Sequence, residues 1–170
     1  MNHSAISSFI WDTADLLRSS YKQHEYGDII LPFTVMRRLD IVLAPTKDAV
    51  LREAQKEIPA ALKQMKSFDE GEVRDKNLKK TAKQDFYNTS AFTMDDLAKD
   101  ADNVKENMVA YINGFSPEIV DIMENFNIYS VISDLDKKGL LFQVIERFCK
   151  PDVDLSPESV SSADMGDIYE

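Results

Sequence analysis

The side chains that most often carry catalysis are few in this sequence and lie far apart. Its two histidines are His3 and His24, and its single cysteine is Cys149. Neither histidine has a second ligand at metal-binding spacing, and Cys149 has no companion histidine motif. Cys149 adjoins an apolar stretch, which favours a packed thiol over a nucleophile. We therefore expect no catalytic residue and no metal site in these 170 residues.

The glycines and carboxylates are equally uninformative about chemistry. The five glycines never form the G-x-G pattern of phosphate-binding loops, and no Walker-type loop occurs. Carboxylates crowd the last third of the chain, but their spread along predicted helices favours a solvated face over paired acid–base work. No cofactor-binding residue is assigned on these grounds.

One cluster of cations stands out in an acidic chain. The net charge is −10, yet residues 74–83 hold five basic side chains and one carboxylate. Phosphate neutralisation requires clustered cations, so this segment is the candidate for DNA binding. A solvated loop is the alternative interpretation. The candidate residues are Arg74, Lys76, Lys79, Lys80 and Lys83.

Four further side chains are candidates for contacts with a partner. Trp11 lies off the centre of its predicted helical stripe, so it fills either a second contact inside the domain or a surface that meets another subunit. Arg38 lies in an otherwise apolar stretch, where structural pairing and a partner-facing guanidinium both remain open. Phe86 and Tyr87, beside the basic cluster, either support that segment or stack on a partner.

The stretch of residues 28–43 is the expected centre of the fold. Its apolar residues leave almost no polar sector at 100° per residue, which predicts a helix buried on most sides. Asp28 can act as the N-cap, and Pro32 lies in or next to the first turn. Arg37 and Asp40 have the spacing of an internal ion pair. The stretch is too short and too charged to span a bilayer.

The remaining pattern predicts an all-α fold. Amphipathic spacing indicates a helix over residues 4–21, while Thr93-x-x-Asp96 and Ser116-Pro117 indicate two further helix starts. No stretch shows convincing strand alternation. Residues 66–90 lose clear periodicity and predict one long polar loop that carries the basic cluster. We expect a compact multi-helix bundle with short connections and that one loop.

Residues 1–155 are expected to form the helical domain. Beyond them the chain turns polar, and then Met165, Ile168 and Tyr169 begin an apolar helical face that the sequence leaves unfinished. We interpret residues 156–170 as a linker and the start of a helix that leads into a following domain. A lone cysteine and an N-terminus unlike a secretory leader predict a cytoplasmic location.

Several segments, in order along the chain, together resemble a known family. They are residues 9–18 (FIWDTADLLR), 26–32 (YGDIILP), 36–40 (MRRLD), 86–90 (FYNTS), 140–148 (LLFQVIERF) and 165–170 (MGDIYE). The resemblance covers essentially the whole chain. It is to the N-terminal helical domain of the modification (methyltransferase) subunit of type I restriction-modification systems.

The resemblance implies a bacterial parent subunit that methylates adenine at N6 in double-stranded DNA with S-adenosylmethionine. It also implies partners, namely a second modification subunit, a specificity subunit and a restriction subunit, and no membrane. The family's glycine-rich cofactor loop and Asn-Pro-Pro-aromatic motif do not occur here, so no catalytic or cofactor residue is carried over. The domain is then a non-catalytic aid to subunit assembly and DNA clamping. A purely structural docking domain without DNA contact is the alternative.

Overall fold

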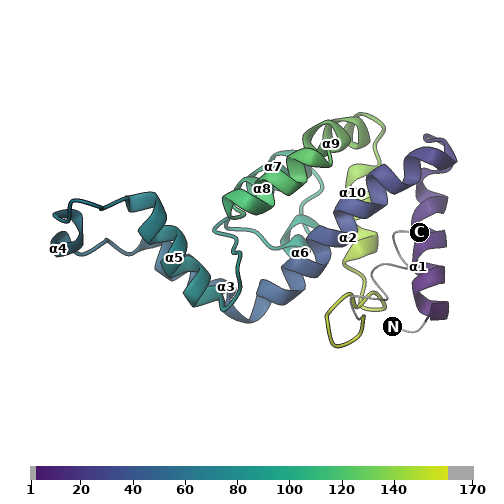
Figure 1. The fold of residues 1–170 in the computed structure, drawn as a ribbon. Coiled ribbons are helices and arrows are strands. Elements are labelled where there is room, and N and C mark those ends of the chain that lie inside the picture. Colours follow the sequence, from purple (N-terminus) through teal and green to yellow (C-terminus); the bar gives the residue numbers. More distant parts are fainter. Residues whose placement is uncertain (1–2, 161–170) are drawn as a thin grey trace.

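The computed structural model describes residues 3–160 of the chain. Within this range the chain is built from helices, and its one recorded β-type pairing is an isolated antiparallel bridge between Asn88 and Phe115. Figure 1 shows a helical body from which an arm projects to one side. The all-α prediction is therefore confirmed.

Helix α2 (Tyr26–Leu43) crosses the body, with α1 (His3–Leu17) and α10 (Leu141–Phe148) packed along it. Aromatic rings join the three helices. The Phe148 ring meets the Phe9 ring edge-on, with centroids 4.9 Å apart, and lies 5.8 Å from the Phe33 ring. All three side chains are almost completely buried, so these contacts make α2 part of the core, as its apolar pattern predicts.

The start of α2 differs from its predicted form. The short 3-10 helix η1 (Gln23–Glu25) leads directly into α2, so the helix begins at Tyr26 and Asp28 is not its N-cap. Asp28 lies instead in the first turn, where a carboxylate complements the helix dipole. Pro32 lies inside the helix and is buried.

The other side of the body is formed by four helices, and the two helix starts predicted for this region are confirmed. Thr93 and Asp96 form a reciprocal capping box at α6, and Ser116 with Pro117 opens α8. Asn127 and Gly139, both with positive φ, separate α9 from its neighbours. The helices are α6 (Met94–Leu97), α7 (Val104–Asn113), α8 (Pro117–Asn125) and α9 (Ile128–Lys137).

The arm, residues 47–82, overturns one prediction. After the 3-10 helix η2 (Ala44–Thr46), α3 (Lys47–Gln55) runs out from the body, α4 (Ala60–Lys63) forms the tip, and α5 (Glu70–Ala82) returns beside α3 (Figure 1). The predicted loop over residues 66–90 is therefore wrong, because α5 occupies most of it.

Helix α5 was not predicted from hydrophobic periodicity, and the reason is physical. Helix α5 packs mainly against α3 and buries only Leu78 and Ala82, so no apolar stripe at helical spacing appears. The helix is instead started by Asp69, whose side chain accepts a hydrogen bond from the Glu72 amide at 3.1 Å. Lys79 and Lys80 in the last turn offset the dipole at the other end.

No helix within residues 3–160 has both the length and the apolar character needed to cross a membrane.

Candidate functional site

The five basic candidates all lie on α5 or at its C-terminal end, but they do different things. Arg74 makes its hydrogen bonds within the arm. Its Nη1 donates to the Glu53 carbonyl at 3.1 Å and to the Lys56 carbonyl at 2.5 Å. Because these carbonyls end α3, Arg74 serves as a cap that ties the two arm helices together.

Lys79 joins the arm to the body. Its Nζ lies 3.0 Å from a carboxylate oxygen of Asp75 on the same helix and 3.0 Å from one of Glu118 on α8. Hydrogen bonds to Glu118 and Asp75 raise the pKa of Lys79. With two carboxylates beside it, Lys79 is already neutralised and is poorly suited to meet a further anion.

The other three lysines form a cationic face. Lys76 and Lys80 are spaced i and i+4, which places them on one side of α5, and Lys83 follows just beyond the helix as its left-handed C-cap residue. All three are exposed, and within residues 3–160 no ion pair is recorded for any of them. Near the end of the helix, Lys80 and Lys83 join Lys79, Gln84 and Asp85 around a shallow hollow of about 410 Å³.

The aromatic pair next to this face supports the fold. Tyr87 is buried, and its hydroxyl donates to the Asp75 carboxylate at 3.0 Å. Burial, reinforced by this hydrogen bond, raises the pKa of Tyr87 to about 12. Phe86 is half-buried against the core. Both rings therefore anchor the C-terminal end of α5. Of the two roles left open by the sequence, support of this segment or stacking on a partner, the packing corresponds to support.

A buried polar network lies where the arm meets the body. The Asp40 carboxylate pairs with Arg37 at 3.1 Å, as the spacing predicts, and accepts hydrogen bonds from the Met94 amide and the Tyr111 hydroxyl. Burial raises the pKa of Asp40, while the Met94 amide and Arg37 act in the opposite direction. Paired in this way, the carboxylate is a structural anchor at the centre of three helices.

Lys47 and Asn88 extend this network and were missed by sequence reasoning. Lys47, the first residue of α3, donates from Nζ to the Asn88 side-chain oxygen at 3.0 Å and to its carbonyl at 3.4 Å. Asn88 in turn donates to the Tyr111 carbonyl at 2.8 Å. Burial lowers the pKa of Lys47 to about 8. The sequence shows only a lysine at the start of a predicted helix, and this pattern does not indicate that its partner is Asn88, 41 residues away.

Arg38 is engaged within the chain. Its Nη1 donates to the Val160 carbonyl at 2.6 Å and to the Leu155 carbonyl at 3.3 Å. Arg38 therefore holds the end of the described chain against α2, which is the structural alternative for this residue. Both carbonyl-bearing residues are themselves fully buried.

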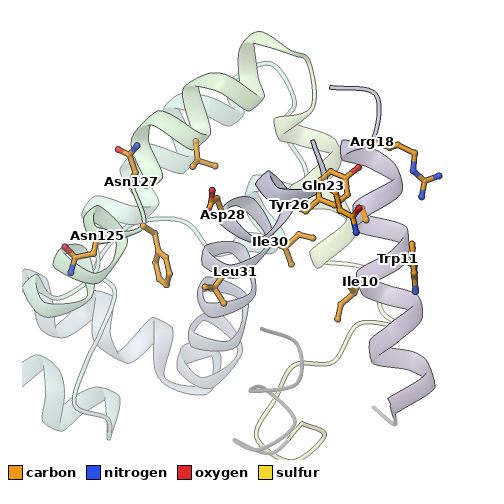
Figure 2. Close-up of a pocket in the computed structure, with 14 residues that line it drawn as sticks. Ile10, Trp11, Arg18, Gln23, Tyr26, Asp28, Ile30, Leu31, Asn125 and Asn127 are labelled. Carbon is orange, nitrogen blue, oxygen red and sulfur yellow. The ribbon is translucent and has the colours of Figure 1, made fainter. Parts of the chain in front are cut away.

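Trp11 is the partner candidate that lies at the surface. It is 65% exposed on α1, so it does not fill a contact inside the described domain. It borders a groove of about 1080 Å³ between α1, the start of α2 and the turn between α8 and α9 (Figure 2). The groove combines apolar side chains with a few polar ones, and its main lining residues are Ile10, Trp11, Arg18, Tyr26, Asp28, Ile30, Leu31, Phe126 and Val131.

The described part of the chain holds no group of three or more His, Cys, Asp or Glu side chains placed to bind a metal ion. Burial raises the pKa of Cys149 to about 12, so its thiol is far less reactive than an exposed one.

Comparison with known proteins identifies the family. A family model described as the HsdM N-terminal domain matches residues 6–148. Neither a curated protein nor a solved structure matches the chain. The matched range includes all the helices from α2 to α10 and nearly all of α1. The chain therefore belongs to the HsdM N-terminal domain family, the N-terminal domain of the modification subunit of type I restriction-modification systems.

Proposed function

We propose that this domain aids subunit assembly and DNA binding in a type I modification enzyme, and that the arm supplies its phosphate contacts. In this proposal residues 1–155 are the helical domain, and residues 156–170 lead toward the catalytic part of the parent subunit. That subunit methylates adenine at N6 with S-adenosylmethionine. It works in the bacterial cytoplasm with a second modification subunit, a specificity subunit and a restriction subunit.

The observation that carries the proposal is the cationic face of α5. Lys76 and Lys80 share one side of α5, and Lys83 at the C-cap lines the same hollow as Lys80. No carboxylate is recorded within ion-pair distance of these three lysines in the described chain. Cations without an internal partner are free to replace the counterions of a phosphate backbone. Lys80 and Lys83 lie at the root of the arm, where the neighbouring Lys79 pairs with Glu118 on α8, and the rest of the arm projects beyond them (Figure 1).

The acidic remainder of the domain favours a limited contact. The chain as a whole carries a net charge of −10, so most of its surface repels DNA. At physiological ionic strength this repulsion fades over about 8 Å, so a local cluster of cations can meet phosphates although the rest of the domain is acidic. Arg74 and Lys79, which are held by other groups, position the face rather than contact DNA in this proposal.

Charge reversal in the complete enzyme tests this role. The Lys80→Glu/Lys83→Glu variant should bind DNA more weakly, and the slope of log affinity against log salt should fall by about two, one for each lysine that no longer meets a phosphate. The matched control is Lys63→Glu/Lys66→Glu, which makes the same charge change on exposed lysines near the arm tip. Equal salt slopes for the two variants would remove the cationic face from the DNA contact.

The second candidate is a docking domain that never touches DNA. It is favoured by exposed apolar side chains near the arm tip, where Leu62 is 37% and Met65 is 56% exposed. Under this hypothesis Met65→Asp should weaken assembly of the subunits, measured by sedimentation velocity, whereas Gln64→Asp beside it should not. DNA affinity would then be unaffected by Lys80→Glu/Lys83→Glu.

A further inference from the structure

The groove between α1, α2 and the α8–α9 turn has an apolar floor. Figure 2 shows Ile10 on α1 and Ile30 and Leu31 on α2 across its middle, with Asn125 and Asn127 on the opposite side. Ile30 is buried, whereas Ile10 and Leu31 are half-buried, so part of their apolar surface stays open. A concave surface of about 1080 Å³ with an apolar floor is typical of grooves that receive a helix by its apolar face.

The rim of this groove carries polar side chains that are available to a partner. Gln23, Asn125 and Asn127 line it and are all exposed. Within residues 3–160 no side-chain hydrogen bond is recorded for any of these three amides. An apolar centre with a polar rim is the usual anatomy of a protein–protein interface.

The open charges beside the groove are negative. Arg18 and Asp28 are the charged side chains that line it, and Arg18 is neutralised by Asp15, whose carboxylate lies 2.6 Å from its Nη2. Asp121 lies one turn before Asn125 on α8. Asp28 and Asp121 are exposed, and the described part of the chain records no ion pair for either. This charge pattern favours a partner with cationic side chains.

We propose that the groove binds an amphipathic helix of a partner protein, with an apolar stripe flanked by lysines and arginines. The stripe covers Ile10 and Leu31, and the cations face Asp28 and Asp121. Trp11, 65% exposed at the edge of the groove, adds the large, rigid contact surface that interface hot spots favour. The groove lies on the body and the cationic face lies on α5, so this proposal goes beyond the DNA role and can fail while that role holds.

A synthetic peptide of about 15 residues is the probe, with leucines at i, i+3, i+4 and i+7 and lysines elsewhere. Its matched counterpart carries glutamates in place of the lysines. In calorimetric titrations the 170-residue chain should bind the lysine peptide at least about tenfold more tightly, because glutamates beside Asp28 repel it. Equal affinities for the two peptides would overturn the proposal.

Leu31→Asp distinguishes docking in the groove from general attraction to an acidic protein. The change adds a negative charge, so general attraction would strengthen binding of the lysine peptide, whereas loss of the apolar floor should weaken it about tenfold. Leu62→Asp makes the same change at the arm tip and should not weaken binding. Circular dichroism checks that both variants are folded. Binding to Leu31→Asp as tight as to the wild type would show that the groove is not the site.

Asp28→Lys leaves the apolar floor intact and tests the charge preference independently of the folding of Leu31→Asp. It should weaken binding of the lysine peptide and strengthen binding of the glutamate peptide. Asp102→Lys, an exposed position that does not line the groove, is the control and should change neither, because distant charges are screened. The same response in both variants would contradict the proposal.

Sedimentation velocity without peptide tests the other occupant, a second copy of this chain. The wild type should sediment as a monomer at every concentration. A concentration-dependent dimer that is lost in Leu31→Asp would show that a second copy fills the groove, and would overturn the assignment to a basic helix.

Discussion

The Tyr111 hydroxyl donates a hydrogen bond to the Asp40 carboxylate at 3.1 Å and joins two helices whose residues are 71 positions apart. Asp40 also holds Arg37, so one buried carboxylate links α2, α7 and the start of α6. Removing a group from such a network costs more than a single hydrogen bond, because the partners that remain are buried without a counterpart.

Asp40→Ala should therefore lower the free energy of unfolding by about 3 kcal/mol, since it leaves the buried Arg37 guanidinium with only the more exposed Asp95 carboxylate, at 3.5 Å, as a partner. Tyr111→Phe removes one hydrogen bond and should cost only about 1 kcal/mol. Urea unfolding followed by circular dichroism measures both. If Asp40→Ala proved no more harmful than Tyr111→Phe, the carboxylate would not be the centre of the network.

Lys47 should make stability depend on pH in an alkaline window. Burial lowers its folded pKa to about 8 from the ordinary 10.5, so between these values the unfolded chain binds more protons. The contribution of Lys47 to stability should then rise with pH across this window, by an amount on the order of 2 kcal/mol. Lys47→Met lacks the titrating group, and the stability of the wild type relative to this variant should rise from pH 8 to pH 10. A constant difference would contradict the lowered pKa.

Gly114 should tolerate no side chain. A Cβ there would lie 2.5 Å from the Ser90 amide nitrogen and 2.9 Å from the Asn88 side-chain oxygen, both in the segment that pairs with Phe115. Gly114→Ala should therefore reduce stability by about 2 kcal/mol. Gly27→Ala is the control, because nothing lies within 4 Å of its Cβ position and alanine favours the helix. Thermal unfolding should rank Gly27→Ala at or above the wild type.

Substitutions at Lys83 and Lys80 distinguish the effect of a lysine's charge on DNA binding from the effect of its backbone conformation on stability. The φ of Lys83 is 59°, a left-handed value that glycine adopts without strain. Lys83→Gly should raise the stability of the domain by about 1 kcal/mol, while Lys80→Gly, inside α5, should lower it by a similar amount. Both variants lack one lysine, so both should weaken DNA binding equally if the proposed contact is correct. Calorimetry and a DNA titration at low salt measure the two effects.

Much of the body could be predicted from the sequence because its signals are local. The capping box of Thr93 and Asp96, the Ser116-Pro117 helix start and the Arg37–Asp40 ion pair each depend on residues within four positions of one another. The apolar pattern of α2 likewise predicted a buried helix. Such features follow from helix geometry and need no knowledge of the tertiary fold.

Neither the helical structure of the arm nor the interactions of its basic side chains could be predicted from such local signals. Helix α5 packs mainly on α3 and buries only Leu78 and Ala82, so its sequence lacks the stripe that marks a helix in a core. Arg74, Lys79 and Lys80 look alike in the sequence, yet one caps α3, one pairs with Glu118 on α8 and one faces solvent. Partners more than ten residues away decided these roles.

The sequence by itself determined the helical class, the buried character of α2 and the family. Periodicity, capping and ordered motifs all depend on residues that are close together in the sequence. Tertiary structure alone decided that α5 is a projecting helix, that Arg38 holds Val160, and that Trp11 borders an open groove. The reason is physical. A side chain's propensity is local, but its burial and its hydrogen-bond partners depend on which distant segments the packed fold places beside it.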